Sequence, residues 1–66
     1  MPVTIHPTAI VNDAARLGED VRIGPFCTVG PDAVLGDRVN LHSHVVIEGH
    51  TTLGADSEVY PFAVLG

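Results

Sequence analysis

The sequence predicts an all-β fold, a parallel β-helix in which short strands wind into a triangular solenoid of about three and a half coils. Three observations predict it. Every sixth residue is aliphatic, the residue four positions later is small or β-branched, and the outward positions change character with a period of three such units. Residues 1–66 are therefore expected to form a single β-helix segment.

The inward positions repeat along the whole chain. The first position of each unit holds Ile5, Val11, Leu17, Ile23, Val29, Leu35, Leu41, Ile47, Leu53, Val59 and Leu65. The position four residues later holds Ala9, Ala15, Val21, Cys27, Ala33, Val39, Val45, Thr51, Ser57 and Ala63. Because burial rewards apolar side chains, both series are expected to point into one narrow interior.

The residue after the aliphatic position is often glycine, as at Gly18, Gly24, Gly30, Gly36, Gly54 and Gly66. Glycine suits a tight turn or a positive φ angle, so each unit is expected to be a short strand followed by a corner. An α-helix is excluded because six residues is not a helical period. A meander of hairpins is disfavoured because it would need two-residue turns between alternating strands.

Three units should complete one coil, so that residues 18 apart stack on one face. The third face, Leu17–Arg22, Leu35–Asn40 and Leu53–Glu58, has mostly charged outward positions and should face water. The second face comprises Val11–Arg16, Val29–Val34 and Ile47–Thr52. The first face comprises Ile5–Ile10, Ile23–Thr28, Leu41–Val46 and Val59–Val64, and its outward positions bear no acidic or basic residue other than histidine.

The first face is the candidate interaction surface. Its outward column Thr8, Phe26, His44 and Phe62 would place apolar side chains against water in an isolated chain. Contiguous exposed apolar surface usually marks an interface, so this face is predicted to pack against other subunits. The alternative is a scatter of surface apolar residues without a partner.

Composition excludes several classes of function. The net charge is −5, with three arginines and no lysine, which argues against binding to nucleic acid or to an anionic membrane surface. No apolar run is long enough to insert into a membrane, and no signal peptide is evident, so a cytoplasmic location is the default expectation. The single cysteine, Cys27, excludes an internal disulfide and fits a reducing compartment.

No catalytic, metal or cofactor site is predicted in this chain. His6 and His42 share a unit position but lie two coils apart, too far for one metal ion, and His44 and His50 fall on neighbouring faces. Cys27 occupies an inward position and is expected to be a core thiol. The acidic residues Glu19, Asp20, Asp32 and Asp37 should lie on corners or on the solvent face.

The last unit is incomplete and has no polar cap, although repeat folds need capping units at their ends. Residues 1–66 are therefore expected to be the N-terminal part of a longer chain. The alternative is a complete small solenoid.

Four runs of sequence carry a more specific resemblance. The runs IHPTAIV (Ile5–Val11), IGPFCTVGP (Ile23–Pro31), SHVVIEGHTTLG (Ser43–Gly54) and EVYPFAVLG (Glu58–Gly66) are distributed over nearly the whole chain. They resemble the beginning of the acyl-carrier-protein–UDP-N-acetylglucosamine O-acyltransferases of lipid A synthesis, which are hexapeptide-repeat transferases.

The resemblance implies a left-handed β-helix, whereas general rules for parallel crossovers favour the right hand. It also implies a cytoplasmic homotrimer that transfers a 3-hydroxyacyl chain from acyl carrier protein to the 3-hydroxyl of UDP-N-acetylglucosamine without a cofactor. The face bearing Phe26, His44 and Phe62 is the expected trimer contact. The family's catalytic and sugar-binding residues match no position in this chain.

Two other functions remain open at this point. One is a related hexapeptide transferase, such as an N-acyltransferase of the same pathway or a sugar-nucleotide acetyltransferase. The other is a non-enzymatic β-helix assembly module. The runs Ser43–Gly54 and Glu58–Gly66 favour the O-acyltransferase.

Overall fold

The computed structural model describes residues 2–66 and contains eleven two-residue strands in three parallel sheets. Sheet A contains β1 (Thr4–Ile5), β4 (Arg22–Ile23), β7 (Asn40–Leu41) and β10 (Glu58–Val59). Sheet B contains β2 (Ile10–Val11), β5 (Thr28–Val29), β8 (Val46–Ile47) and β11 (Val64–Leu65). Sheet C contains β3 (Arg16–Leu17), β6 (Val34–Leu35) and β9 (Thr52–Leu53).

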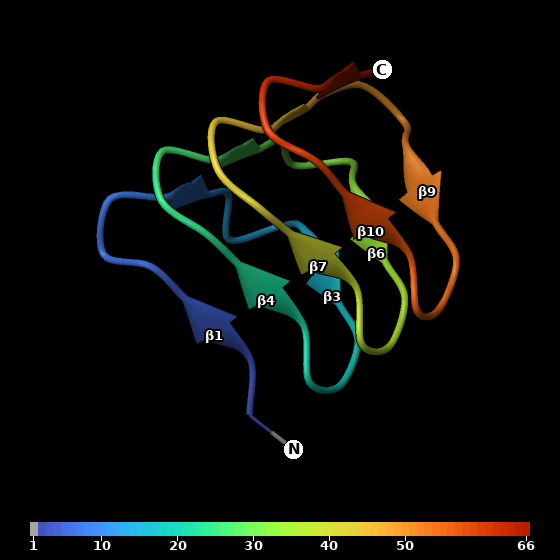
Figure 1. Cartoon of the computed structure of the whole chain (residues 1–66). Coiled ribbons are helices and arrows are strands. Elements are labelled where there is room, and N and C mark those ends of the chain that lie inside the picture. The colour runs from blue at the N-terminus through green and yellow to red at the C-terminus, as the bar shows by residue number, and fades with distance from the viewer. Residues whose placement is uncertain (1) are drawn as a thin grey trace.

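The chain visits the three sheets in turn, so each coil contributes one strand to each sheet. In Figure 1 the strands of sheet A lie nearest the viewer and run towards the left, while successive coils advance to the right. This arrangement is a left-handed β-helix, as the family resemblance implied and against the general preference of parallel crossovers. Sheets of four, four and three strands agree with the predicted three and a half coils.

The strand register confirms the 18-residue stacking. Ile5 pairs with Ile23, and Ile23 pairs in turn with Leu41. The boundaries of the faces differ from the prediction, however. Each strand consists of an aliphatic residue and the outward residue before it, so a predicted face such as Leu17–Arg22 begins in β3, passes round a corner and ends in β4. The hydrophobic pattern defines which residues are inward, but it does not locate the bends between them.

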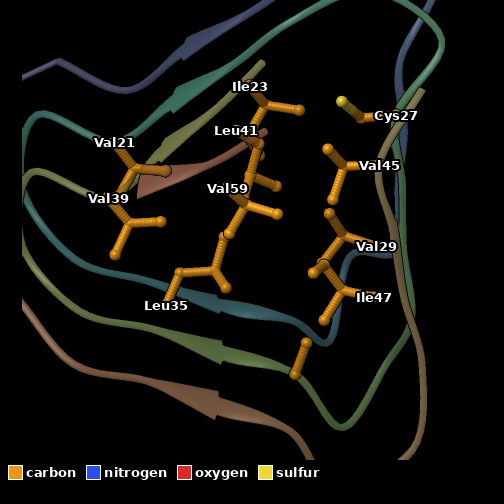
Figure 2. Close-up of a cluster of buried hydrophobic side chains, with 11 residues drawn as sticks. Val21, Ile23, Cys27, Val29, Leu35, Val39, Leu41, Val45, Ile47 and Val59 are labelled. Atoms are coloured by element: carbon orange, nitrogen blue, oxygen red, sulfur yellow. The ribbon is translucent and has the colours of Figure 1, made fainter. Parts of the chain in front are cut away.

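The interior consists entirely of the predicted inward positions. The buried residues are Val21, Ile23, Cys27, Val29, Ala33, Leu35, Val39, Leu41, Val45, Ile47 and Val59. Figure 2 shows most of these side chains pointing towards one another inside the coils. The interior of the triangular solenoid is narrow. In each six-residue unit, one branched aliphatic residue and one smaller residue are enough to fill it.

The corners do not use glycine in the way the sequence analysis predicted. Positive φ angles occur at Asp20, Phe26, Arg38, His44, Asp56 and Phe62, all three residues after an aliphatic position. Of the six glycines that follow an aliphatic residue, Gly66 alone has a positive φ. A left-handed conformation is unfavourable for a residue with a side chain, so these corners need a compensating interaction.

Hydrogen bonds between coils provide that compensation. The amide of His44 donates to the carbonyl oxygen of Pro25 at 3.0 Å. The amide of Arg38 donates to the carbonyl oxygen of Glu19 at 2.7 Å. The positive φ turns the amide along the axis of the solenoid, where the preceding coil presents an acceptor. The amides of Asp56 and Phe62 donate in the same way, so four of the six corners satisfy a backbone group that an isolated turn would leave to water.

The glycines serve close packing between coils instead. A Cβ atom at Gly24 would collide with the carbonyl oxygen of His42 in the next coil, and one at Gly36 would lie 2.7 Å from the amide nitrogen of Ala55. Glycine is therefore required at these positions because neighbouring backbones approach them closely.

Candidate functional site

An aromatic column follows the corner between sheets A and B. We call Thr8, Phe26, His44 and Phe62 the aromatic corner. The His44 ring lies between the two phenyl rings, with ring centroids 5.1 Å from Phe26 and 5.0 Å from Phe62. The Thr8 hydroxyl accepts a hydrogen bond from the Phe26 amide at 3.0 Å. The predicted alignment of these four residues is confirmed, although they lie on a bend and not on a flat side.

The aromatic corner is exposed, and sheet B beside it carries further exposed apolar side chains. Phe26 is 59% exposed and Phe62 is 78% exposed. On sheet B the outward residues Ile10 and Val64 are 70% and 69% exposed. Ile10 and Val64 lie on the two outer strands of this sheet, with Thr28 and Val46 between them in the column. Exposed apolar side chains gathered on one part of a surface are typical of an interaction surface.

An open groove of about 480 Å³ lies over sheet A, beside the aromatic corner. Its lining includes His6, Arg22, Gly24, Asn40 and His42. Gly24 interrupts a column of outward side chains at this point. The column has His6 in the preceding coil and His42 in the following coil. Gly24 has no side chain to cover this part of sheet A, and the carbonyl oxygen of His42 packs against its backbone.

His42 has two partners at the edge of this groove. Its Nε2 atom lies 2.7 Å from Glu58 Oε2, and its ring lies 4.8 Å from that of Tyr60, with 38° between the ring planes. The Tyr60 contact follows from the 18-residue spacing, since His42 and Tyr60 are 18 residues apart. The Glu58 contact was missed, because these residues are 16 apart and belong to adjacent columns.

The corner between sheets C and A carries a ladder of charged side chains. Arg38 Nε donates to Asp56 Oδ1 at 2.7 Å, and Arg38 Nη2 donates to Asp56 Oδ2 at 3.1 Å. The Glu19 amide donates to Asp37 Oδ1 at 2.9 Å. Arg38 and Asp56 are both largely exposed, so the prediction that this part of the surface faces water is confirmed.

The bidentate pair shifts the ionisation of both partners. The hydrogen bond from Arg38, together with its positive charge, lowers the pKa of Asp56 below its ordinary value of 3.8. The hydrogen bond to Asp56 and its negative charge raise the pKa of Arg38. Both effects favour the charged state in the folded chain.

We expect Arg38→Gln to return the pKa of Asp56 towards 3.8, as measured by the pH dependence of its carboxyl NMR signal. A depressed carboxyl pKa stabilises the fold above the unfolded-state value, and this contribution is lost as the pH falls through the folded-state value. Arg16→Gln, on sheet C, is the matched control and should leave the pKa of Asp56 unchanged. An unchanged Asp56 titration in Arg38→Gln would contradict the assignment.

The remaining reactive groups do not converge. The Cys27 thiol is buried and donates to the carbonyl oxygen of His42 at 3.6 Å, so its predicted inward position is confirmed. His50 is largely exposed and lies 3.8 Å from Asp32 at the corner between sheets B and C. Within residues 2–66, no three His, Cys, Asp or Glu side chains lie close enough together to hold a metal ion. The same residues form no helix that is long and apolar enough to cross a membrane.

Comparison with known proteins adds a family to this geometry. The sequence pattern of the family described as bacterial transferase hexapeptide (six repeats) matches residues 14–49, more than half of the chain. The acyl-[acyl-carrier-protein]–UDP-N-acetylglucosamine O-acyltransferase of Bartonella bacilliformis is 61% identical over 62 residues, which cover 94% of this chain and 23% of that protein. The chain thus spans about a quarter of the length of the curated relatives it matches.

Solved structures agree with this result. The UDP-N-acetylglucosamine acyltransferase from Campylobacter jejuni matches with a TM-score of 0.93 and 36% identity, over 96% of this chain and 25% of that one. LpxA from Acinetobacter baumannii matches with a TM-score of 0.90 and 45% identity, over 94% of this chain and 24% of that one. Together with the stacked six-residue units and their inward aliphatic series, these matches place the chain in the bacterial transferase hexapeptide family.

Proposed function

We propose that this chain is scaffold of an O-acyltransferase that moves a 3-hydroxyacyl group from acyl carrier protein to the 3-hydroxyl of UDP-N-acetylglucosamine. The observation that supports it most strongly is the 61% identity to an enzyme named for this acyl carrier and this sugar nucleotide. The six-residue pattern is common to many transferases, but identity at this level extends to outward positions that the fold does not dictate.

The chain contributes stacked coils to this activity and no catalytic residue, cofactor or metal ligand of its own. Acyl transfer to a hydroxyl needs a base near the attacking oxygen and a hydrogen-bond donor for the oxyanion. The resemblance to the acyltransferases places their catalytic and sugar-binding residues at no position of this chain, and the Cys27 thiol is buried. We assign both catalytic functions to residues outside these 66.

A chimeric enzyme tests the proposal. The matching segment of the Bartonella bacilliformis enzyme is replaced by this chain, and acyl transfer from acyl carrier protein to UDP-N-acetylglucosamine is measured. We expect the chimera to keep kcat/KM within about tenfold of the parent, since the exchange leaves every catalytic group in place. This chain alone should show no transfer. A folded chimera without activity, or transfer by this chain alone, would contradict the proposal.

The aromatic corner is the surface through which we propose that copies associate, as a homotrimer in the cytoplasm. Phe26 and Phe62 are more than half exposed in the single chain, and their rings form one continuous stack with His44. Burying such rings against a second copy would remove a large apolar area from water.

Charge at this corner should therefore disrupt association. We expect Phe26→Glu and Phe62→Glu each to convert the trimer to monomer at micromolar concentration, because an unpaired carboxylate would be buried at the contact. Sedimentation equilibrium measures the mass directly. Val34→Glu, a half-exposed site on sheet C, is the matched control and should leave the trimer intact. A trimer that survives both phenylalanine substitutions would refute the assignment of this corner.

A further inference from the structure

One outward column of sheet A is an aromatic stack with a member missing. The column runs through His6, Gly24, His42 and Tyr60, each following a strand of sheet A (β1, β4, β7 and β10 in Figure 1). The backbone register aligns these positions, because the amide of His6 bonds to Ile23 and that of Gly24 bonds to Leu41. The His42 and Tyr60 rings are 4.8 Å apart. Gly24 alone has no ring to contribute.

The gap has the height of one flat ring. Neighbouring strands lie about 4.7–4.9 Å apart, so the positions of His6 and His42, two coils apart, are separated by about 9–10 Å. A ring midway between them would lie about 4.8 Å from each imidazole, within the range of about 4.5–7 Å for stacked aromatic rings. The groove at this point, about 480 Å³ in volume, is large enough for a small ligand.

Hydrogen bonds restrain the two flanking imidazoles. His6 Nδ1 lies 2.8 Å from the Thr8 hydroxyl, and His42 Nε2 lies 2.7 Å from Glu58. These contacts limit rotation of both rings, so the gap does not need to be formed anew when a ligand enters. A site that is already ordered binds with a smaller loss of conformational entropy.

The positively charged side chain of Arg22 lines the groove beside Gly24. Arg22 lies two residues before Gly24, and alternate residues of a strand point to the same side. Across residues 2–66 no carboxylate lies within ion-pair distance of Arg22, whereas Arg38 is paired with Asp56. In its own column Arg22 is flanked by the neutral residues Thr4 and Asn40. Glu58, the nearest acidic residue in that column, comes after Asn40 and bonds to His42.

We propose that this groove binds a flat aromatic ring that carries a carboxylate. The ring lies in the groove over the outer side of the Gly24 backbone, between the His6 and His42 side chains, and the carboxylate accepts hydrogen bonds from the Arg22 guanidinium. This site adjoins the aromatic corner through the contact of His6 with Thr8, and it does not depend on the proposed acyl transfer. A ligand for this site needs a planar ring and a carboxylate attached to it that can reach Arg22.

Benzoate is the probe. Titration of the 66-residue chain with benzoate, followed by amide NMR shifts, should give saturable changes centred on Gly24 and His42. Cyclohexanecarboxylate has the same charge and a similar size but no flat ring. It should bind at least about twofold more weakly, because ring stacking contributes about 0.5–1.5 kcal/mol.

Two variants test the two halves of the site. His6→Ala removes one flanking ring and should weaken benzoate binding about threefold to tenfold. Arg22→Gln should weaken it up to about fivefold, as for an exposed ion pair. Arg16→Gln makes the same charge change on sheet C and should alter the affinity less than twofold. Amide spectra that retain the pattern of the parent chain confirm that each variant is folded.

Four outcomes would overturn the proposal. Benzoate shifts that do not saturate, that centre on Phe26 and Phe62, or that are matched by cyclohexanecarboxylate would exclude a ring site at Gly24. Equal weakening by Arg16→Gln and Arg22→Gln would exclude a local contact with the carboxylate. Shifts at Gly24 that appear on changing the protein concentration without benzoate would show that a second copy fills the groove.

Discussion

Replacing Ile47 with alanine is expected to lower the free energy of unfolding by about 2–5 kcal/mol. Ile47 is fully buried in β8, where it pairs with Val29 of the preceding coil and Leu65 of the following one. Removing three carbon atoms leaves a cavity that touches both neighbours. The interior is only one side chain deep on each face, so no second layer of side chains can move in to fill it.

The consequence should be large for a chain of this size. A domain of 66 residues has a total stability of about 3–10 kcal/mol. Chemical denaturation followed by circular dichroism should therefore show a much lower midpoint, or a chain that is partly unfolded without denaturant. Ile10→Ala is the matched control, because Ile10 is 70% exposed, and it should change the stability by no more than about 0.5 kcal/mol. Equal losses from the two substitutions would contradict the assignment of Ile47 to the core.

Replacing Gly24 with alanine is expected to destabilise the fold by about 1–3 kcal/mol or more, the usual effect of forcing extra atoms into packed structure. The added methyl group would collide with the carbonyl oxygen of His42, a backbone atom directly after β7. Backbone cannot move aside as a flexible side chain can. The coils that contain β4 and β7 would have to separate, which lengthens the hydrogen bonds between them.

Gly54 provides the matched control for this prediction. It occupies the same unit position as Gly24, its φ is not positive, and a methyl group there would meet nothing within 4 Å. Gly54→Ala should therefore be neutral or stabilising by up to about 1 kcal/mol, because alanine restricts the unfolded chain. The quantity to compare is the thermal or urea midpoint of the two variants. A Gly24→Ala chain as stable as Gly54→Ala would show that the coils do not approach as described.

The comparison also separates two explanations for glycine in a repeat. If positive φ were the reason, the two substitutions would have similar effects, since the positions are equivalent in the repeat. Close approach of the next coil predicts different effects, because Gly24 is covered by His42 whereas Gly54 is open.

The aromatic corner could be predicted from the sequence, and its neighbouring groove could not. The 18-residue spacing places Phe26, His44 and Phe62 in one column, and the structure stacks them 5.0–5.1 Å apart. The groove depends on the absence of a side chain at Gly24 and on contacts between adjacent columns, such as that of His42 with Glu58. A repeat of fixed period predicts contacts within a column, but contacts between columns depend on how sharply each corner bends.

The six-residue spacing is enough to identify the inward residues, because only one winding of the chain buries all of its aliphatic side chains. The period of three units in the outward positions also indicates that residues 18 apart are neighbours. The tertiary structure decided where the chain bends, placing positive φ at residues such as Phe26 and Arg38, and why Gly24 must be glycine. The physical reason is that bends and close approaches are stabilised by hydrogen bonds from one coil to the next, and these form only once the coils are stacked.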